Sequence, residues 1–116
     1  MRMWKVPTRV LCRQHLLGEH VEMHMFVGSY KKNINLKGYI DKGLLDPNYM
    51  SQRHSELITE MPLRGYNHKS PIDENICELI SKDYGHHTSL VDEGENIREL
   101  IKRCNECEKR IEEFYE

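Results

Sequence analysis

Residues 13–22, which read RQHLLGEHVE, decide how the rest of the chain is organised. Apolar residues recur here at a spacing that lines one side of a helix, at Leu11, Leu16, Leu17, Val21 and Met25. The other side carries hydrogen-bonding and titratable groups that helical spacing keeps close together, Gln14, His15, Glu19 and Glu22. Because a helix can fold without such a collection, this segment is the first place to look for chemistry.

Length and composition set the outer limits of the fold and the function. The 116 residues fit one domain, residues 1–116, with a modest core. Charged residues make up 31% of the chain and no long apolar run occurs, so we expect no membrane span, no secretory signal peptide and a cytoplasmic protein. The net charge of -2 argues against tight, indiscriminate coating of DNA. Lysine and arginine nevertheless dominate residues 1–69, which leaves room for a local basic face.

The periodicity predicts an all-α domain with three main helices, an extended N-terminal segment and long connecting loops. We expect the first helix to begin after a Thr8 cap and to stop at Gly28. Asp46-Pro47 predicts the start of the second helix, which should end near Leu63. A last helix should begin near Asp92 and continue to the C-terminus. Shorter helical segments are expected at 36–42 and 73–82, and Trp4 should anchor the N-terminal segment.

The cysteines are expected to be reduced thiols, because no signal peptide is predicted. Cys104 and Cys107 form a C-x-x-C pair, but no second C-x-x-C or H-x-x-H pair completes a zinc-finger pattern. Cys104 also falls on an apolar helical stripe and suits a core position. We therefore expect no metal. A zinc-binding interaction domain built on these cysteines and the pair His86-His87 remains an alternative.

Two separate blocks carry a family resemblance. The segment 13–22 followed by Phe26-Val27-Gly28 resembles the first helix of the phage pyrimidine-dimer DNA glycosylases, the ultraviolet-damage endonuclease V family. Arg53, the run from Glu56 to Glu60 and the sequence RGYN at 64–67 resemble the second helix of that family and its exit. The opening MRMW also resembles a subgroup. The likeness covers residues 1–70 well and the last helix only loosely.

The resemblance implies a DNA repair glycosylase with abasic-site lyase activity. In this family the α-amine of the first residue attacks the sugar C1′ of the damaged nucleotide, expels the base and forms a Schiff base, and β-elimination then cuts the strand. That position is Met1 here, and the bulky Arg2 behind it should prevent removal of Met1. The lower ordinary pKa of an α-amine, about 7.7–8, suits it to this role better than a lysine. Glu22 aligns with the catalytic glutamate, which stabilises positive charge at the sugar and handles proton transfers.

The resemblance further implies contacts with double-stranded DNA that carries ultraviolet lesions or abasic sites, made by a monomer without metal or small-molecule cofactor. Arg2, Gln14 and His15 match positions near the lesion. Val21 and Met25 stand where relatives have arginines that grip phosphate, so other groups should supply these contacts. The residues expected to touch DNA are Arg2, Gln14, His15, His20, Lys31, Lys32, Arg53 and Lys69. A non-catalytic helical module of the same fold, which binds nucleic acid or a host protein, is the main alternative.

Overall fold

The computed structural model describes residues 1–68, 70–86 and 90–116. Within these ranges the chain forms helices and no β-strand, so the all-α prediction is confirmed. The elements are the 3-10 turn η1 (Thr8–Val10) and the helices α1 (Arg13–Lys31), α2 (Lys37–Asp41), α3 (Met50–Leu63), α4 (Glu74–Tyr84), α5 (Glu93–Arg103) and α6 (Asn105–Phe114). None of the described helices is long and apolar enough to cross a membrane.

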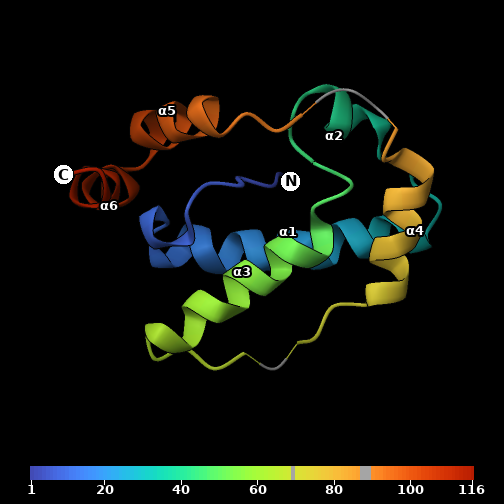
Figure 1. Cartoon of the computed structure of the whole chain (residues 1–116), viewed down its shortest axis with the longest axis horizontal. Coiled ribbons are helices and arrows are strands. Elements are labelled where there is room, and N and C mark those ends of the chain that lie inside the picture. The colour runs from blue at the N-terminus through green and yellow to red at the C-terminus, as the bar shows by residue number, and fades with distance from the viewer. Residues whose placement is uncertain (69, 87–89) are drawn as a thin grey trace.

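The molecule is flat, with extents of 40 × 30 × 17 Å. The long helix α1 and the crossing helix α3 form its centre, while α4 stands at one end and α5 and α6 at the other (Figure 1). The N-terminal segment enters between α1 and the C-terminal helices. One cluster of buried apolar side chains extends from Met3 near the N-terminus to Ile111 in α6. Trp4 is 3% exposed within it, so it anchors the N-terminal segment as expected.

The first helix differs from the prediction at both ends. Thr8 begins only the short turn η1, and the chain is extended again at Leu11 and Cys12. Helix α1 therefore starts at Arg13, with the Cys12 sulfur accepting a hydrogen bond from the His15 backbone N–H. At the other end, Gly28 stays helical. The left-handed residue that follows the helix is Asn33, with a φ of 61°, and asparagine tolerates that conformation better than most residues.

Two further helix boundaries differ from those predicted from the sequence. Asp46-Pro47 starts a turn rather than α3, because the Asp46 side chain accepts from the Asn48 backbone N–H at 3.0 Å and also pairs with Lys5. Helix α3 then begins at Met50 and ends at Leu63, as predicted, and Gly65 follows it in the left-handed region (φ 81°). The single last helix is in fact two helices. Cys104 adopts an extended conformation (φ -144°, ψ 109°) that breaks the chain between α5 and α6.

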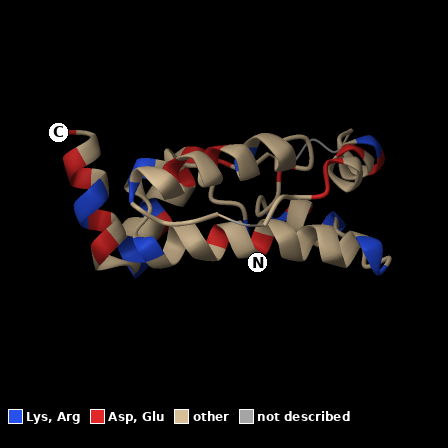
Figure 2. Ribbon diagram, turned by 90° about the horizontal axis from the view of Figure 1, so that it is seen from below, with Lys and Arg blue, Asp and Glu red and all other residues tan. Residues whose placement is uncertain are grey.

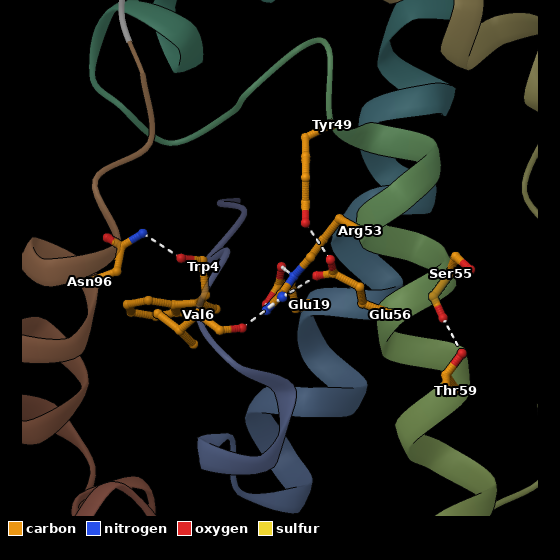
Figure 3. A network of polar contacts seen from close by, with 9 residues as sticks. All are labelled: Trp4, Val6, Glu19, Tyr49, Arg53, Ser55, Glu56, Thr59 and Asn96. Carbon is orange, nitrogen blue, oxygen red and sulfur yellow. Dashed lines mark hydrogen bonds and ion pairs between the residues drawn. The ribbon is translucent and has the colours of Figure 1, made fainter. Parts of the chain in front are cut away.

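A buried ion pair joins α1 and α3 to the N-terminal segment (Figure 3). The Arg53 guanidinium makes two hydrogen bonds to the Glu19 carboxylate, at 2.6 and 2.9 Å, and both side chains are almost fully buried. Arg53 also donates to the Val6 carbonyl and to Glu56, and Tyr49 donates to the same carboxylate of Glu56. The pair thus fixes the approach of three separate segments beneath the site described next.

Candidate functional site

The N-terminus and the polar side of α1 face each other across one cleft of about 600 Å³. Five residues singled out from the sequence line it together. They are Met1, Arg2, Gln14, His15 and Glu22. The remaining lining comes from the N-terminal segment, α1, the loop before α3 and the end of α5, through Trp4, Gly18, Glu19, Leu44, Arg103 and Cys104. The fold thereby brings together groups that lie up to 103 positions apart in the chain.

Helical spacing places the side chains that form the α1 wall of this cleft. Gln14, Gly18 and Glu22 are four residues apart and therefore lie one above another on the helix. A Cβ atom at Gly18 would meet nothing within 4 Å, so the glycine leaves open space between the other two side chains. Glu22 is half-buried on this wall. The wall therefore combines a carboxylate with room for a ligand beside it.

The opposite wall is the N-terminal segment, which is held at several points. The Met3 backbone N–H donates to the Leu44 carbonyl at 2.6 Å. Asn96 of α5 is buried and binds the segment twice, donating to the Trp4 carbonyl at 2.7 Å and accepting from the Arg2 guanidinium. These contacts fix the backbone that leads to Met1. The position of the chain start thus depends on a helix near the other end of the sequence.

Two arginines give the cleft a positive side. The Arg2 guanidinium lies 4.0 Å from the centre of the Trp4 ring, and that of Arg103 lies 5.3 Å from the same ring. Partial burial and the neighbouring Arg103 lower the pKa of Arg2, and nearby carboxylates, including that of Glu22, act in the opposite direction. Arg103 also pairs with Glu99 at 2.6 Å, so the arrangement can attract an anion beside the Glu22 carboxylate mainly through Arg2.

His15 connects the cleft to a group of cysteines. Its ring makes an edge contact with the Trp4 ring at 5.7 Å. Burial, and secondarily the charge of Arg103, lower the pKa of His15, which favours the neutral imidazole. The ring nitrogen Nδ1 lies 3.2 Å from the Cys12 sulfur and 3.5 Å from the Cys107 sulfur.

Comparison with known proteins identifies the family of the chain. The family model for pyrimidine dimer DNA glycosylase matches residues 1–74, well over half of the chain. The chain belongs to this family. No curated protein and no solved structure gave a match. The matched part includes the N-terminal segment, α1 and α3, whereas α5 and α6 lie beyond it.

The other described residues that were expected to touch DNA do not line the cleft. Arg53 is 1% exposed, and its donors are taken up by Glu19, Glu56 and the Val6 carbonyl. It is therefore not available to bind a DNA phosphate. Lys31 and Lys32 are exposed at the end of α1, where Lys31 pairs with Asp73 at 3.2 Å. Lys69 lies outside the described residues.

His20 belongs to a cluster of four histidines between α1, α3 and the loop after it. The cluster consists of His20, His24, His54 and His68. The His20 ring lies 4.7–5.0 Å from each of the other three rings, measured between ring centres. Burial, followed by the repulsion from these neighbours, lowers the pKa of His20 to about 4. At neutral pH the ring is therefore uncharged and packs like an aromatic side chain.

Among the described residues, two groups of side chains have ligand atoms close enough to hold a metal ion. One is the histidine cluster and the other comprises Cys12, His15, Cys104 and Cys107. His86, which the sequence had offered as a partner for the C-x-x-C pair, belongs to neither group, and His87 lies outside the described residues. The sequence signal that was missed is the C-x-x-H spacing of Cys12 and His15, which supplies two further ligand atoms beside the C-x-x-C pair. Asn96 and Arg103 were also missed, because nothing in the sequence of an acidic amphipathic helix marks the residue that reaches the cleft.

Proposed function

We propose that this member of the family is a DNA glycosylase with abasic-site lyase activity that excises ultraviolet-induced pyrimidine dimers. The α-amine of Met1, as the first residue of the mature protein, is the nucleophile. Glu22 is the acid–base group. The observation that supports this assignment best is that Met1 and Glu22 line the same cleft, with Arg2, Gln14 and His15 beside them.

The proposed reaction has two stages. In the first, the neutral amine attacks C1′ of the damaged nucleotide, a carbon–nitrogen bond forms, and the bond from C1′ to the base breaks. The sugar ring then opens and the amine becomes a protonated imine, a Schiff base. Glu22 stabilises the positive charge that develops at the sugar, takes a proton from the attached amine and delivers it to the ring oxygen O4′ as the ring opens, while the departing base takes a proton from water.

In the second stage the imine makes the hydrogen on C2′ acidic. Glu22, as a carboxylate, removes that proton, and the electron pair expels the 3′ phosphate, which cuts the strand. Water finally hydrolyses the imine and frees the amine for another turnover. None of these steps requires a metal ion or a cofactor to act on the substrate.

The positive side of the cleft supports a DNA substrate. Arg2 and Arg103 flank the Trp4 ring, where a phosphate next to the reacting sugar can bind. The nucleotide must leave the base stack to reach the amine. This step costs least where the base pair is already damaged, as at a pyrimidine dimer or an abasic site.

Borohydride trapping of the full-length, untagged protein tests the proposal. Intact mass first verifies that the chain starts at Met1. Three duplexes are compared, with one cyclobutane thymine dimer, with one abasic site and without damage. We expect a reduced covalent complex with both damaged duplexes only. Trapping should fail in Glu22→Gln and in a protein with one residue added before Met1, whereas Glu113→Gln on exposed α6 serves as the matched control and should trap normally.

The outcomes separate the candidates. Trapping on the abasic duplex alone would assign a lyase and remove the glycosylase step. No trapping by folded protein that still binds the duplexes would contradict the enzyme and favour the non-catalytic DNA-binding module. One structural observation favours that module. Val21 and Met25, which stand where relatives have arginines that grip phosphate, are 54% and 48% exposed beside Glu22.

A further inference from the structure

Four metal-ligand side chains meet where the start of α1 contacts the break between α5 and α6. Cys12 and His15 come from the α1 end, and Cys104 and Cys107 come from the other end of the chain. Their ligand atoms all lie within 4.8 Å of one another. We propose that these four residues bind a structural Zn²⁺ ion that fastens the two C-terminal helices to the family part of the chain.

The local backbone supports metal ligation. Both halves of the site are short x-x pairs, Cys12-x-x-His15 and Cys104-x-x-Cys107, which is the spacing typical of zinc-binding turns. In each pair the first sulfur accepts a hydrogen bond from the backbone N–H of the second residue, at 3.4 Å. The Cys107 sulfur accepts from the Cys12 backbone N–H at 3.3 Å. Each of the three sulfurs therefore receives an N–H donor, which stabilises a thiolate.

Three of the six separations between the ligand atoms match those of a tetrahedral zinc site, and all six are within 4.8 Å. With metal–sulfur bonds of about 2.3 Å and metal–nitrogen bonds of about 2.0–2.1 Å, two sulfurs should be about 3.8 Å apart and a sulfur and a nitrogen about 3.5 Å apart. The Cys12 and Cys104 sulfurs are 3.9 Å apart. The His15 Nδ1 atom lies 3.2 and 3.5 Å from the sulfurs of Cys12 and Cys107. Each of these separations is within a few tenths of an ångström of the expected value.

The chemistry of the ligand set selects zinc and a structural role. Three thiolates and one neutral imidazole form a closed four-ligand set, which leaves no position for a substrate. Cys12 and Cys107 are buried, and Cys104 and His15 are half-buried, so the site is largely shielded from solvent. A disulfide does not explain the arrangement, because the cysteines are free and the sulfurs of Cys12 and Cys104 stand well beyond the bond length of about 2.05 Å.

The histidine cluster is the weaker candidate for a metal site. Its ring nitrogens already have hydrogen-bond partners, since His54 and His68 both face the Ser70 carbonyl, at 3.3 and 2.7 Å. The Nε2 atoms of His20 and His24 face each other at 3.3 Å, which allows one to donate and the other to accept. One nitrogen of each ring therefore has a hydrogen-bond partner without an ion, whereas three neighbouring thiols that lack a cation have only weak donors to offer one another.

The position of the proposed ion gives it a consequence for the cleft. His15 and Cys104 line the cleft, and Arg103 precedes the second of them. A zinc ion on Nδ1 of His15 fixes the proton on Nε2, so this nitrogen becomes a hydrogen-bond donor for a phosphate or sugar. The ion would thus hold two cleft residues in place without contacting the reacting atoms. It would also tie α5 and α6, which lie beyond the matched residues 1–74, to Cys12 and His15, which lie within them.

Metal analysis of the untagged, full-length protein tests the proposal. Protein purified without chelator should contain about one tightly bound zinc ion per chain that survives dialysis. After removal of the metal, titration with Co²⁺ should give the intense visible bands of tetrahedral cobalt together with a thiolate-to-cobalt charge-transfer band in the near ultraviolet. Cys107→Ser and Cys104→Ser should lower zinc affinity more than about 100-fold, since loss of even a hydrogen-bonding neighbour of a ligand weakens binding about 10–100-fold.

Cys77→Ala is the matched control, because Cys77 is a buried cysteine in α4 that lies outside the proposed ligand set. It should retain zinc and the cobalt spectrum. His20→Gln should also retain both. Absence of the charge-transfer band, or equal zinc in the wild type and in Cys107→Ser, would overturn the proposal. Should a serine variant fail to fold, cobalt spectra of the wild-type protein and of His15→Cys, which adds a fourth thiolate to the band, decide instead. None of these readouts depends on DNA cleavage.

Discussion

At the scale of single residues, Arg53 is the clearest case of a group whose role changes between sequence and structure. It lies in the segment that resembles the family and is a cation, which suggested a phosphate contact. The fold instead places it 1% exposed against the Glu19 carboxylate. We expect Arg53→Ala to lower the free energy of unfolding by about 3–5 kcal/mol, because it leaves Glu19 buried without its partner. Urea unfolding followed by circular dichroism measures this change.

Arg98→Ala is the control for that measurement. Arg98 pairs with Glu95 on the exposed side of α5, and both side chains are about two-thirds exposed, at 67% and 70%. Such a pair contributes about 0–1 kcal/mol. Equal stabilities for the two variants would mean that the buried pair does not hold α1, α3 and the N-terminal segment together.

At the scale of helices, local signals predicted those boundaries that local chemistry fixes. Asp92 caps α5, accepting from the Glu95 backbone N–H at 2.9 Å, as the sequence suggested. Asp73 caps α4 in the same way, accepting from the Ile76 backbone N–H at 3.2 Å. The break at Cys104 was not predictable, because the apolar periodicity continues across it from Ile97 to Phe114. The break is explained by contacts with Cys12 and His15, which lie about 90 residues earlier in the chain.

The difference between features fixed by local sequence and features fixed by distant contacts also applies to the site. The family resemblance implied catalytic or DNA-contacting roles for Met1, Arg2, Gln14, His15 and Glu22, and in the structure these five residues line one cleft. Asn96 was missed because its role depends on how α5 packs. We expect Asn96→Ala to lower stability by about 1–3 kcal/mol, since the Trp4 carbonyl loses its donor and Arg2 loses an acceptor. We also expect slower single-turnover trapping, because the segment that carries Met1 is held less firmly.

Asn75→Ala, on the exposed side of α4, provides the reference for the α5 variant. It should change neither the urea midpoint nor the trapping rate. If Asn96→Ala lowered stability but trapped at the wild-type rate, α5 would support the fold without positioning the N-terminal segment.

The contact of α1 with α3 through the histidine cluster should depend on pH. The pKa of His20 is about 4 in the folded protein, whereas an unfolded histidine titrates near pH 6.5. Between these values the unfolded chain binds a proton that the folded chain does not, so stability is complete above about pH 6.5 and falls as the pH is lowered toward 4. Each pKa unit corresponds to about 1.4 kcal/mol, and partial exposure of the ring reduces the expected loss to about 1–2 kcal/mol.

Urea unfolding at a series of pH values from 7 to 5 measures this dependence. His20→Gln should flatten the profile, whereas Asn75→Ala on the exposed side of α4 should leave it unchanged. A profile of His20→Gln as steep as that of the wild type would assign the pH dependence to other groups.

At the scale of the whole molecule, charged side chains lie at both ends of the long axis. The acidic and basic residues of α6 alternate at one end, and the basic end of α1 lies at the opposite end (Figure 2). The cleft with Arg2 and Arg103 opens on α1 between these ends. A duplex seated on the cleft and extended along α1 would reach Lys32, whose Cα lies about 15 Å farther along the helix axis than that of Glu22.

This geometry predicts how salt affects DNA binding. Lys32 is exposed, so Lys32→Gln should remove one phosphate contact and reduce the slope of log K against log salt by about 0.9. The loss should be equal on damaged and undamaged duplexes, because a phosphate contact carries no information about the lesion. Lys109→Gln on α6, an equally exposed lysine near Glu106, should leave the slope unchanged. If Lys32→Gln left the slope as unchanged as Lys109→Gln does, the duplex would not extend along α1 as far as Lys32.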